Sequence, residues 1–234
     1  MADDVMTGDA SGIVFDLDGV LIDTEPIYLE TINSILCDFQ VKPLSAQAYE
    51  EFIGKFADYT WSTLGDRYGL SVTHAELKAS YDDRLERTLP SRLQLRPEAR
   101  VLLDAVGRLG IRRAVATSSR RRWLDLKIET LGLETFFGAV VSAEDVGKFK
   151  PEPDVFLAAA DQAGIDPAKA VAIEDSPSGI TSAKRAGMWV FALRTDSGGG
   201  LDLSEADRVI DSLEEIDLGA LFGARNGGHA HSVV

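Results

Sequence analysis

The chain has 234 residues, of which 45% are hydrophobic and 26% charged, a composition typical of a soluble globular protein with one large domain or a domain that carries an insertion. Its net charge of −14 argues against nucleic acid or an anionic membrane as a partner, because both select basic surfaces. The single cysteine, Cys37, cannot form an internal disulfide, and its apolar helical surroundings predict a buried thiol. The N-terminal segment lacks the basic and apolar blocks of a signal peptide, so we expect a cytoplasmic protein.

The first predicted strand, at residues 12–17, ends on two carboxylates and a glycine. The apolar run that contains Ile13, Val14 and Phe15 is typical of a buried strand, and Asp16, Asp18 and Gly19 follow it. Ligands of open α/β sheets bind at the carboxyl ends of strands. Two carboxylates placed there repel each other unless a cation lies between them or one keeps its proton, and Mg²⁺ is a suitable cation. Read alone, the segment is equally compatible with a polar turn, since Asp and Gly are common turn formers.

A block of helices is predicted after this strand. Thr24 is expected to cap the first helix, with Glu25 and Pro26 in its first turn. Apolar residues then recur at helical spacing, and no strand is predicted between residues 24 and 90. Beyond the first helix, further helices are predicted at 46–53, 59–68 and 74–89.

From residue 97 onward the pattern alternates between helices and strands. Such alternation with short connections predicts a parallel sheet that is covered on both faces. We therefore predict an α/β fold, a doubly wound Rossmann-like parallel-sheet core with an inserted all-helical cap. The core comprises 12–22 and 92–222, the cap comprises 23–91, and flexible tails are expected at 1–11 and 223–234. The later strands are predicted at 113–117, 138–141, 170–173, 189–193 and 209–210, and the helices at 97–109, 120–131, 154–163, 176–186 and 212–218.

Polar side chains follow several of the predicted strands and so meet at one edge of the sheet. Thr117 ends one strand, Glu174 and Asp175 end another, and Lys150 lies in a loop between them. Together with Asp16 and Asp18, these groups suit Mg²⁺-assisted phosphoryl transfer, in which a cation, an ammonium and a hydroxyl orient the phosphate oxygens. Lys148 is a nearby alternative to Lys150.

These motifs, in this order, resemble those of haloacid-dehalogenase-superfamily hydrolases with a C1-type helical cap, and the chain is similar to β-phosphoglucomutases and sugar-phosphate phosphatases. The resemblance, which spans about 12–218, implies that Asp16 is a nucleophile that becomes an aspartyl phosphate. It implies that Asp18 is the general acid and base, that Thr117 holds a phosphoryl oxygen, and that Lys150 bridges the phosphate and Asp16. It also implies Mg²⁺ as the cofactor, with Asp16, Asp18, Glu174 and Asp175 as the metal-binding residues.

The expected chemistry places different demands on the first two carboxylates. Asp16 has to be ionised to attack phosphorus, which Mg²⁺ and Lys150 favour. Asp18 has to hold a proton when the ester breaks, so we expect its pKa to be raised. The resemblance also implies that an acidic residue at position 18 belongs to an enzyme that cleaves phosphate esters, rather than one that cleaves carbon–halogen or carbon–phosphorus bonds.

Two departures from the mutase pattern favour a phosphatase. Tyr28 lies near the place where the mutases carry a cap histidine, and Ala57 aligns with their phosphate-binding arginine, although Lys55 could stand in. We expect a Mg²⁺-dependent phosphatase that acts on a small phosphorylated metabolite, a sugar or polyol phosphate. The alternatives are a phosphosugar mutase and a catalytically silent phosphate-binding protein. A monomer is the default expectation, with a dimer as the alternative. The candidate substrate-binding residues are Ser118, Ser119, Arg120, Glu25 and Lys55, with Tyr28 and Trp61 as further cap contacts.

Overall fold

The structure, a computed structural model, describes residues 8–223. Most of the two expected tails, at 1–7 and 224–234, lies outside the described residues. Residues 8–11, which belong to the expected N-terminal tail, form backbone hydrogen bonds with the body of the protein. The Gly8 amide donates to the Ala220 carbonyl and the Ser11 amide to the Lys169 carbonyl, both at 2.8 Å.

The centre of the molecule is a six-stranded sheet in which every neighbouring pair of strands is parallel. The order is β3-β2-β1-β4-β5-β6, which confirms the predicted doubly wound fold. The first strand is central, so the ends of its two neighbours flank Asp16. The strands are β1 (Gly12–Phe15), β2 (Arg112–Thr117), β3 (Ala139–Ser142), β4 (Ala170–Glu174), β5 (Trp189–Leu193) and β6 (Arg208–Ile210).

Helices cover both faces of this sheet, as the alternation of side chains along β1 requires. Ile13 and Phe15 belong to one buried cluster and Val14 to the other. The first cluster includes α5 (Pro97–Arg108) and α6 (Arg121–Thr130), and the second includes α8 (Asp154–Gln162) and α9 (Pro177–Arg185). The short helices α7 (Ala143–Val146) and α10 (Leu218–Phe222) were not predicted, and the predicted helix at 212–218 is only the 3-10 turn η3 (Leu213–Glu215). A further 3-10 turn, η2 (Pro167–Lys169), precedes β4.

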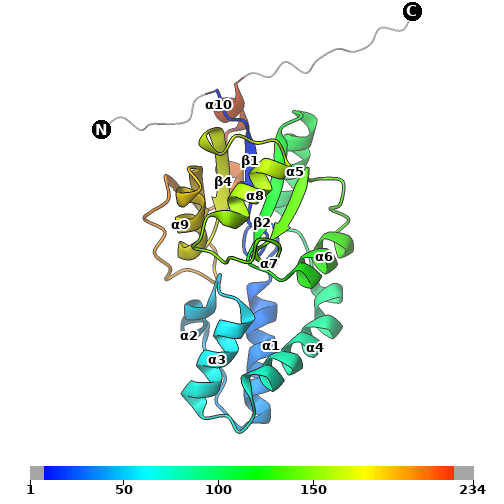
Figure 1. Cartoon of the computed structure of the whole chain (residues 1–234), viewed down its shortest axis with the longest axis vertical. Coiled ribbons are helices and arrows are strands. Elements are labelled where there is room, and N and C mark those ends of the chain that lie inside the picture. The colour runs from blue at the N-terminus through cyan, green and yellow to red at the C-terminus, as the bar shows by residue number, and fades with distance from the viewer. Residues whose placement is uncertain (1–7, 224–234) are drawn as a thin grey trace, which may run out of the picture.

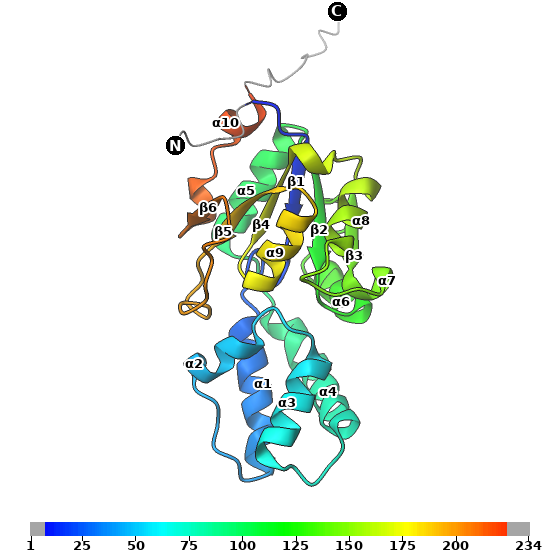
Figure 2. The same ribbon diagram turned by 60° about the vertical axis from the view of Figure 1, so that its left-hand side comes forward.

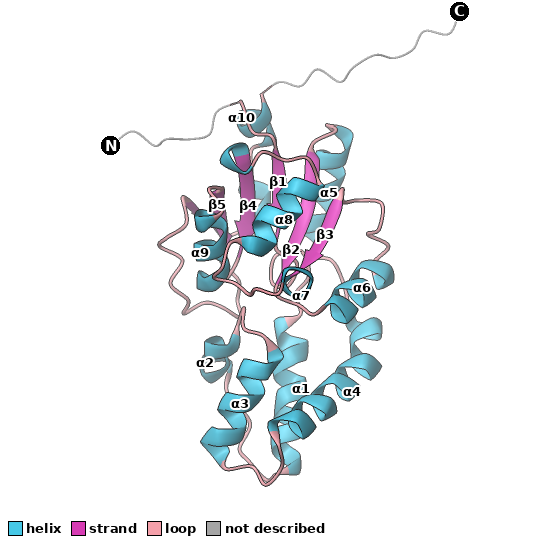
Figure 3. Ribbon diagram, viewed as in Figure 1, coloured by secondary structure: helices cyan, strands magenta, loops and turns pink. Residues whose placement is uncertain are grey.

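A separate group of helices, residues 25–92, lies at the carboxyl end of the sheet (Figures 1, 2 and 3). We call this group the cap. The structure places no strand between residues 25 and 92, all of which it describes. No helix within residues 8–223 is both long and apolar enough to cross a bilayer. The cap comprises α1 (Glu25–Asp38), α2 (Ala46–Tyr49), the 3-10 turn η1 (Glu50–Phe52), α3 (Ala57–Tyr68) and α4 (His74–Arg92).

Two expectations for α1 are wrong. Cys37 is exposed rather than buried, because the helix turns its Ile32, Ile35 and Leu36 side chains inward and leaves the next position outside. Thr24 does occupy the N-cap position, but its side chain does not cap the helix. Its hydroxyl instead donates to Asp18 Oδ1 at 2.6 Å.

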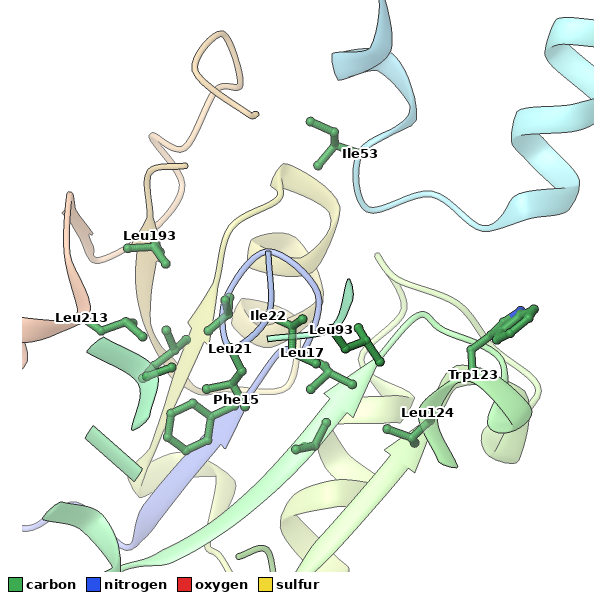
Figure 4. Packing of buried hydrophobic residues seen from close by; sticks show 14 of the residues in the cluster. Phe15, Leu17, Leu21, Ile22, Ile53, Leu93, Trp123, Leu124, Leu193 and Leu213 are labelled. Atoms are coloured by element: carbon green, nitrogen blue, oxygen red, sulfur yellow. The ribbon is translucent and has the colours of Figure 1, made fainter. Parts of the chain in front are cut away.

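The two segments that join the cap to the sheet run side by side. Ile22 forms an antiparallel bridge with Leu95, and the Arg96 amide donates to the Leu21 carbonyl at 2.9 Å. Leu17, Leu21 and Ile22 are buried beside Leu93 at this junction (Figure 4). The loop that follows β1 is therefore held firmly where it leads into the cap.

Candidate active site

Lys150 lies buried between two carboxylates at the carboxyl ends of the central strands. Its Nζ donates to Asp16 Oδ1 at 2.5 Å, to Glu174 Oε1 at 2.6 Å and to the Ala116 carbonyl at 3.0 Å. Burial by itself would lower the pKa of Lys150, but Asp16 and Glu174 outweigh burial and raise it, so the ammonium stays charged. Lys148, the alternative lysine, pairs with Asp154 at the surface.

Asp16 needs more positive charge than the protein itself supplies. Burial raises its pKa to about 7, Lys150 opposes that shift, and Glu174 and Asp18 add to it. The carboxylate is 8% exposed and has Lys150 as its close cation. Near neutral pH a second cation close to Asp16 would complete its ionisation.

The two acidic residues after β4 differ in their surroundings. Glu174 Oε2 accepts hydrogen bonds from the amides of Asp175 and Ser176 at 2.8 and 2.9 Å and from the Ser176 hydroxyl at 3.0 Å. With its other oxygen on Lys150, Glu174 is engaged on both sides. Asp175 Oδ2 is buried and has no hydrogen-bond partner among the described residues. Burial, together with Glu174 and Asp16, raises the pKa of Asp175 well above its ordinary value.

Asp18 is held by several donors from three segments of the chain. Oδ1 accepts from Thr24 at 2.6 Å and from the Tyr28 hydroxyl at 3.0 Å, and Oδ2 accepts from Ser119 at 2.8 Å. Lys127 Nζ donates to both oxygens at 2.6 Å. The expectation of a raised pKa for Asp18 is wrong, because the charge and hydrogen bonds of Lys127 outweigh the effect of burial and lower the pKa.

Lys127 is a residue of the site that the sequence analysis missed. It lies on α6 and its side chain is fully buried. A signal was present, because Lys127 shares the inward face of its helix with Leu124 and Ile128, and a lysine at such a position is almost always paired.

The hydroxyl segment after β2 also reaches the site. Thr117 is buried at the strand end, and its Oγ1 accepts the Ser119 amide at 3.0 Å. Ser118 lines the same cavity as Asp16 and Lys150. Ser119 accepts from Lys127 at 2.8 Å while it donates to Asp18.

The cavity, of about 110 Å³, lies between these strand ends and the cap. On the same measure one water needs roughly 10–15 Å³, so the space can hold several waters or a small ligand. The structure brings all the sequence-predicted site residues to this cavity. Aromatic and aliphatic side chains form most of its cap wall: Tyr28, Ile32, Tyr49, Phe52, Phe56, Trp61, Tyr81 and Leu85.

Two polar residues of the cap wall, Glu25 and Trp61, have at most one hydrogen-bond partner for their side chains among the described residues. Glu25 is buried, and Tyr49, which donates to it at 2.5 Å, is its one hydrogen-bond partner among the described residues. Burial raises the pKa of Glu25 to about 7 despite this bond. The Trp61 Nε1 group is buried with no partner within residues 8–223.

The basic candidates lie at the mouth of the cavity. Lys55 is exposed and forms no ion pair within the described part of the chain. Arg120 donates to Asp58 of the cap at 2.6 Å, and its neighbour Arg122 pairs with Glu86 of the cap at 2.7 Å. These two arginines thus connect the core to the cap.

The chain is similar to known proteins in sequence and in fold. The family model for haloacid dehalogenase-like hydrolases matches residues 13–193. Fructose-1-phosphate phosphatase YqaB of Escherichia coli is 31% identical over 76% of this chain and 93% of its own length. A phosphorylated carbohydrates phosphatase of Thermotoga maritima is 29% identical over 75% of this chain and 81% of its own.

A solved structure shares the fold. CbbY of Rhodobacter sphaeroides, in complex with xylulose-(1,5)bisphosphate, superposes with a TM-score of 0.78 over 91% of this chain and 99% of its own, at 24% identity. Because the family model covers most of the chain, from β1 to the end of β5, and these relatives align along most of its length, the chain belongs to the haloacid dehalogenase-like hydrolase family.

Proposed function

We propose that this protein is a Mg²⁺-dependent phosphatase that hydrolyses a small sugar or polyol phosphate through an aspartyl phosphate on Asp16. The observation that carries the proposal is the position of Asp16, beside Lys150 and at the floor of a cavity that the cap closes. The names of the phosphatase relatives support it, since they describe enzymes that act on phosphorylated carbohydrates.

The residues present fit a magnesium ion. Within residues 8–223 no three acidic, imidazole or thiol side chains form a ready-made metal centre, and the Lys150 ammonium lies between Asp16 and Glu174. However, Asp175 offers a buried oxygen without a partner, and a Cβ on Gly19 would lie 1.9 Å from that oxygen. Gly19 has a φ of +82°, which suits glycine, so its loop leaves room for the Asp175 carboxylate.

Asp16, Asp175 and the main-chain carbonyl of Asp18 would hold the ion, while Glu174 would hold Lys150. Oxygen ligands of this kind are those that Mg²⁺ prefers. The bound ion would supply positive charge that favours the ionised form of Asp16 and offsets charge on the phosphoryl group.

The protein's own groups account for the two chemical steps. A carboxylate oxygen of Asp16 bonds to phosphorus as the ester P–O bond breaks, and Lys150 and Thr117 hold the phosphoryl oxygens. The small share of enzyme in which Asp18 is protonated, which its lowered pKa limits, gives this proton to the leaving oxygen. Water then bonds to phosphorus and gives a proton to Asp18, and the bond between phosphorus and Asp16 breaks, which restores the enzyme.

The cap wall supports an uncharged, polyhydroxylated leaving group. Aromatic rings can cover the apolar faces of a sugar, while the Glu25 carboxyl and the Trp61 Nε1–H can bind its hydroxyls. At the mouth of the cavity, Lys55 is the one cation that forms no ion pair in the described part of the chain. A single exposed lysine would bind a second phosphate only weakly. Tyr28 lies near the place where the mutases carry a cap histidine, and its hydroxyl donates a hydrogen bond to Asp18. These features favour hydrolysis over a mutase reaction.

A panel of sugar and polyol monophosphates with Mg²⁺ tests the proposal, with released phosphate as the measurement. We expect turnover that a chelator abolishes and that added Mg²⁺ restores. Absence of turnover with every ester would support the silent phosphate-binding protein. Interconversion of sugar 1- and 6-phosphates without net release would support the mutase.

Asp16→Asn tests the nucleophile directly. The amide cannot attack phosphorus, so we expect no covalent phosphoenzyme and a loss of kcat of at least about 10³-fold, on the order seen when a nucleophile is removed. Intact-protein mass spectrometry of acid-quenched enzyme measures the phosphoenzyme. An Asn variant that still gained the mass of a phosphoryl group would show that another residue is the nucleophile.

A further inference from the structure

The fully buried Lys127 forms no hydrogen bond or ion pair with the residues that we assign to the phosphoryl group itself, namely Asp16, Thr117 and Lys150. Its three ammonium hydrogens are accounted for by Asp18 Oδ1 and Oδ2 at 2.6 Å and by the Ser119 hydroxyl at 2.8 Å. The ammonium also lies 5.4 Å from the centre of the Tyr28 ring. A buried lysine with every donor directed at one carboxylate and its neighbour points to a role exercised through that carboxylate.

The other donors to Asp18 come from different parts of the fold. Thr24 directly precedes the cap and Tyr28 lies in its first helix, whereas Ser119 and Lys127 belong to the core. Both oxygens of the carboxylate are thereby fixed in direction. Lys127 is the one charged member of this group, and it alone contacts both oxygens.

We infer that Lys127 is a positioning residue that holds the Asp18 carboxylate where it can take a proton from the water that attacks the phosphoenzyme. This inference rests on the proposed function. In that step the water oxygen bonds to phosphorus, the bond between phosphorus and Asp16 breaks, and the water proton passes to Asp18. Lys127 neither gains nor loses a proton in the step.

The inference predicts which kinetic constant changes. With p-nitrophenyl phosphate the leaving group departs without needing a proton, so formation of the phosphoenzyme does not depend on Asp18. Lys127→Met should therefore leave kcat/KM for this substrate within about threefold of wild type. Hydrolysis of the phosphoenzyme should slow and lower kcat by about 10- to 100-fold, within the contribution of a positioned general base.

A rapid-mixing experiment with the full-length Mg²⁺-loaded enzyme and p-nitrophenyl phosphate measures both steps. We expect Lys127→Met to show a burst of p-nitrophenolate equal to the enzyme concentration, followed by a slow steady state. Lys148→Met is the matched control, since that lysine is 57% exposed and pairs with Asp154 rather than Asp18. It should retain wild-type constants.

A double-mutant cycle separates positioning from a general structural role. If Lys127 acts through Asp18, then Lys127→Met should lower kcat no further in an Asp18→Asn background. This double variant also removes both buried charges, so it serves if the single Met variant does not fold. Lys127→Arg keeps the positive charge but changes the shape of the group that carries it, so its kcat should lie between those of Lys127→Met and wild type.

Three results would overturn the inference: a parallel fall in kcat and kcat/KM, the absence of a burst, or additive losses in the cycle. Failure of the proposed function would look different, because wild-type enzyme would then form no phosphoenzyme with p-nitrophenyl phosphate and Mg²⁺.

Discussion

Asp18 and Glu25 are carboxylates of the same cavity, yet their pKa values move in opposite directions. Burial acts to raise both. The Lys127 ammonium donates hydrogen bonds to both carboxylate oxygens of Asp18, and it lowers the pKa of that carboxylate. Glu25 has only a hydroxyl donor, Tyr49, close to it, and its pKa is raised. Lys127 is therefore the main reason why Asp18 is ionised at neutral pH, whereas Glu25, with a pKa of about 7, is partly protonated there.

The raised pKa of Glu25 predicts that this residue makes the protein less stable as pH rises. Its pKa goes from 4.5 to about 7 on folding, so between these values the folded state holds a proton that the unfolded state has lost, and stability falls. At about 1.4 kcal/mol for each pKa unit, the full effect is ~3 kcal/mol. Stability from this group is complete below about pH 4.5 and is lost as pH passes 7.

Glu25→Gln should remove that dependence, because the amide keeps the shape and can still accept the Tyr49 hydrogen bond. Urea unfolding at pH 5 and pH 8 measures it. Between pH 5 and pH 8, the free energy of unfolding should fall by ~3 kcal/mol more in wild type than in the Gln variant. The charged groups near Glu25, namely Asp18, Lys127 and Asp23, are present in both proteins. If the free energies of unfolding of the two proteins differed by the same amount at both pH values, Glu25 would be ionised in the folded state.

At the scale of elements, strand ends were predictable and side-chain partners across the fold were not. Asp16, Thr117 and Glu174 could be brought together from sequence because parallel strands end at one edge of a sheet, whatever their detailed packing. The pairing of Lys127 with Asp18 joins positions 109 residues apart and depends on how α6 is rotated. The exposure of Cys37 depends on the rotation of α1 in the same way, and the apolar pattern alone did not fix that rotation.

The start of α9 supports the active site by contact with Glu174. A Cβ on Gly179 would lie 1.7 Å from Glu174 Oε1, the oxygen that binds Lys150. Gly179→Ala should therefore displace this carboxylate, destabilise the fold by about 1–3 kcal/mol and lower kcat.

Gly107→Ala is the matched control for this prediction. Gly107 lies in the helix α5, and a Cβ there would approach nothing closer than 3.6 Å. Alanine should stabilise that helix by about 0.5–1 kcal/mol without a change in activity. Thermal unfolding and steady-state kinetics of both variants measure the contrast. Equal stability of the two alanine variants would mean that Glu174 can move at little cost.

At the scale of the whole molecule, several contacts that join the cap to the core lie at the surface. Phe56 stacks on Phe149 with ring centroids 4.6 Å apart, and the Gly200 amide donates to Glu50 at 3.1 Å. The ion pairs Arg120–Asp58 and Arg122–Glu86 complete the closure. Exposed ion pairs contribute about 0.2–1 kcal/mol each and weaken with salt. Such contacts let a cap open for substrate and product without unfolding.

Asp58→Asn with Glu86→Gln should therefore shift the cap towards open arrangements while the free energy of unfolding falls by less than about 2 kcal/mol. Cys37, exposed on the cap and the single cysteine of the chain, can carry one spin label, and Val101→Cys, at a position that is 60% exposed on α5 of the core, can carry the other. We expect the distance distribution between the labels to broaden in the double variant, and in wild type when salt rises from ~0.05 to ~0.5 M. Asp83→Asn is the control, since it breaks an exposed ion pair to Arg87 that lies wholly within α4. If that control broadened the distribution as much as the double variant, the ion pairs of Arg120 and Arg122 would not be what holds the cap closed.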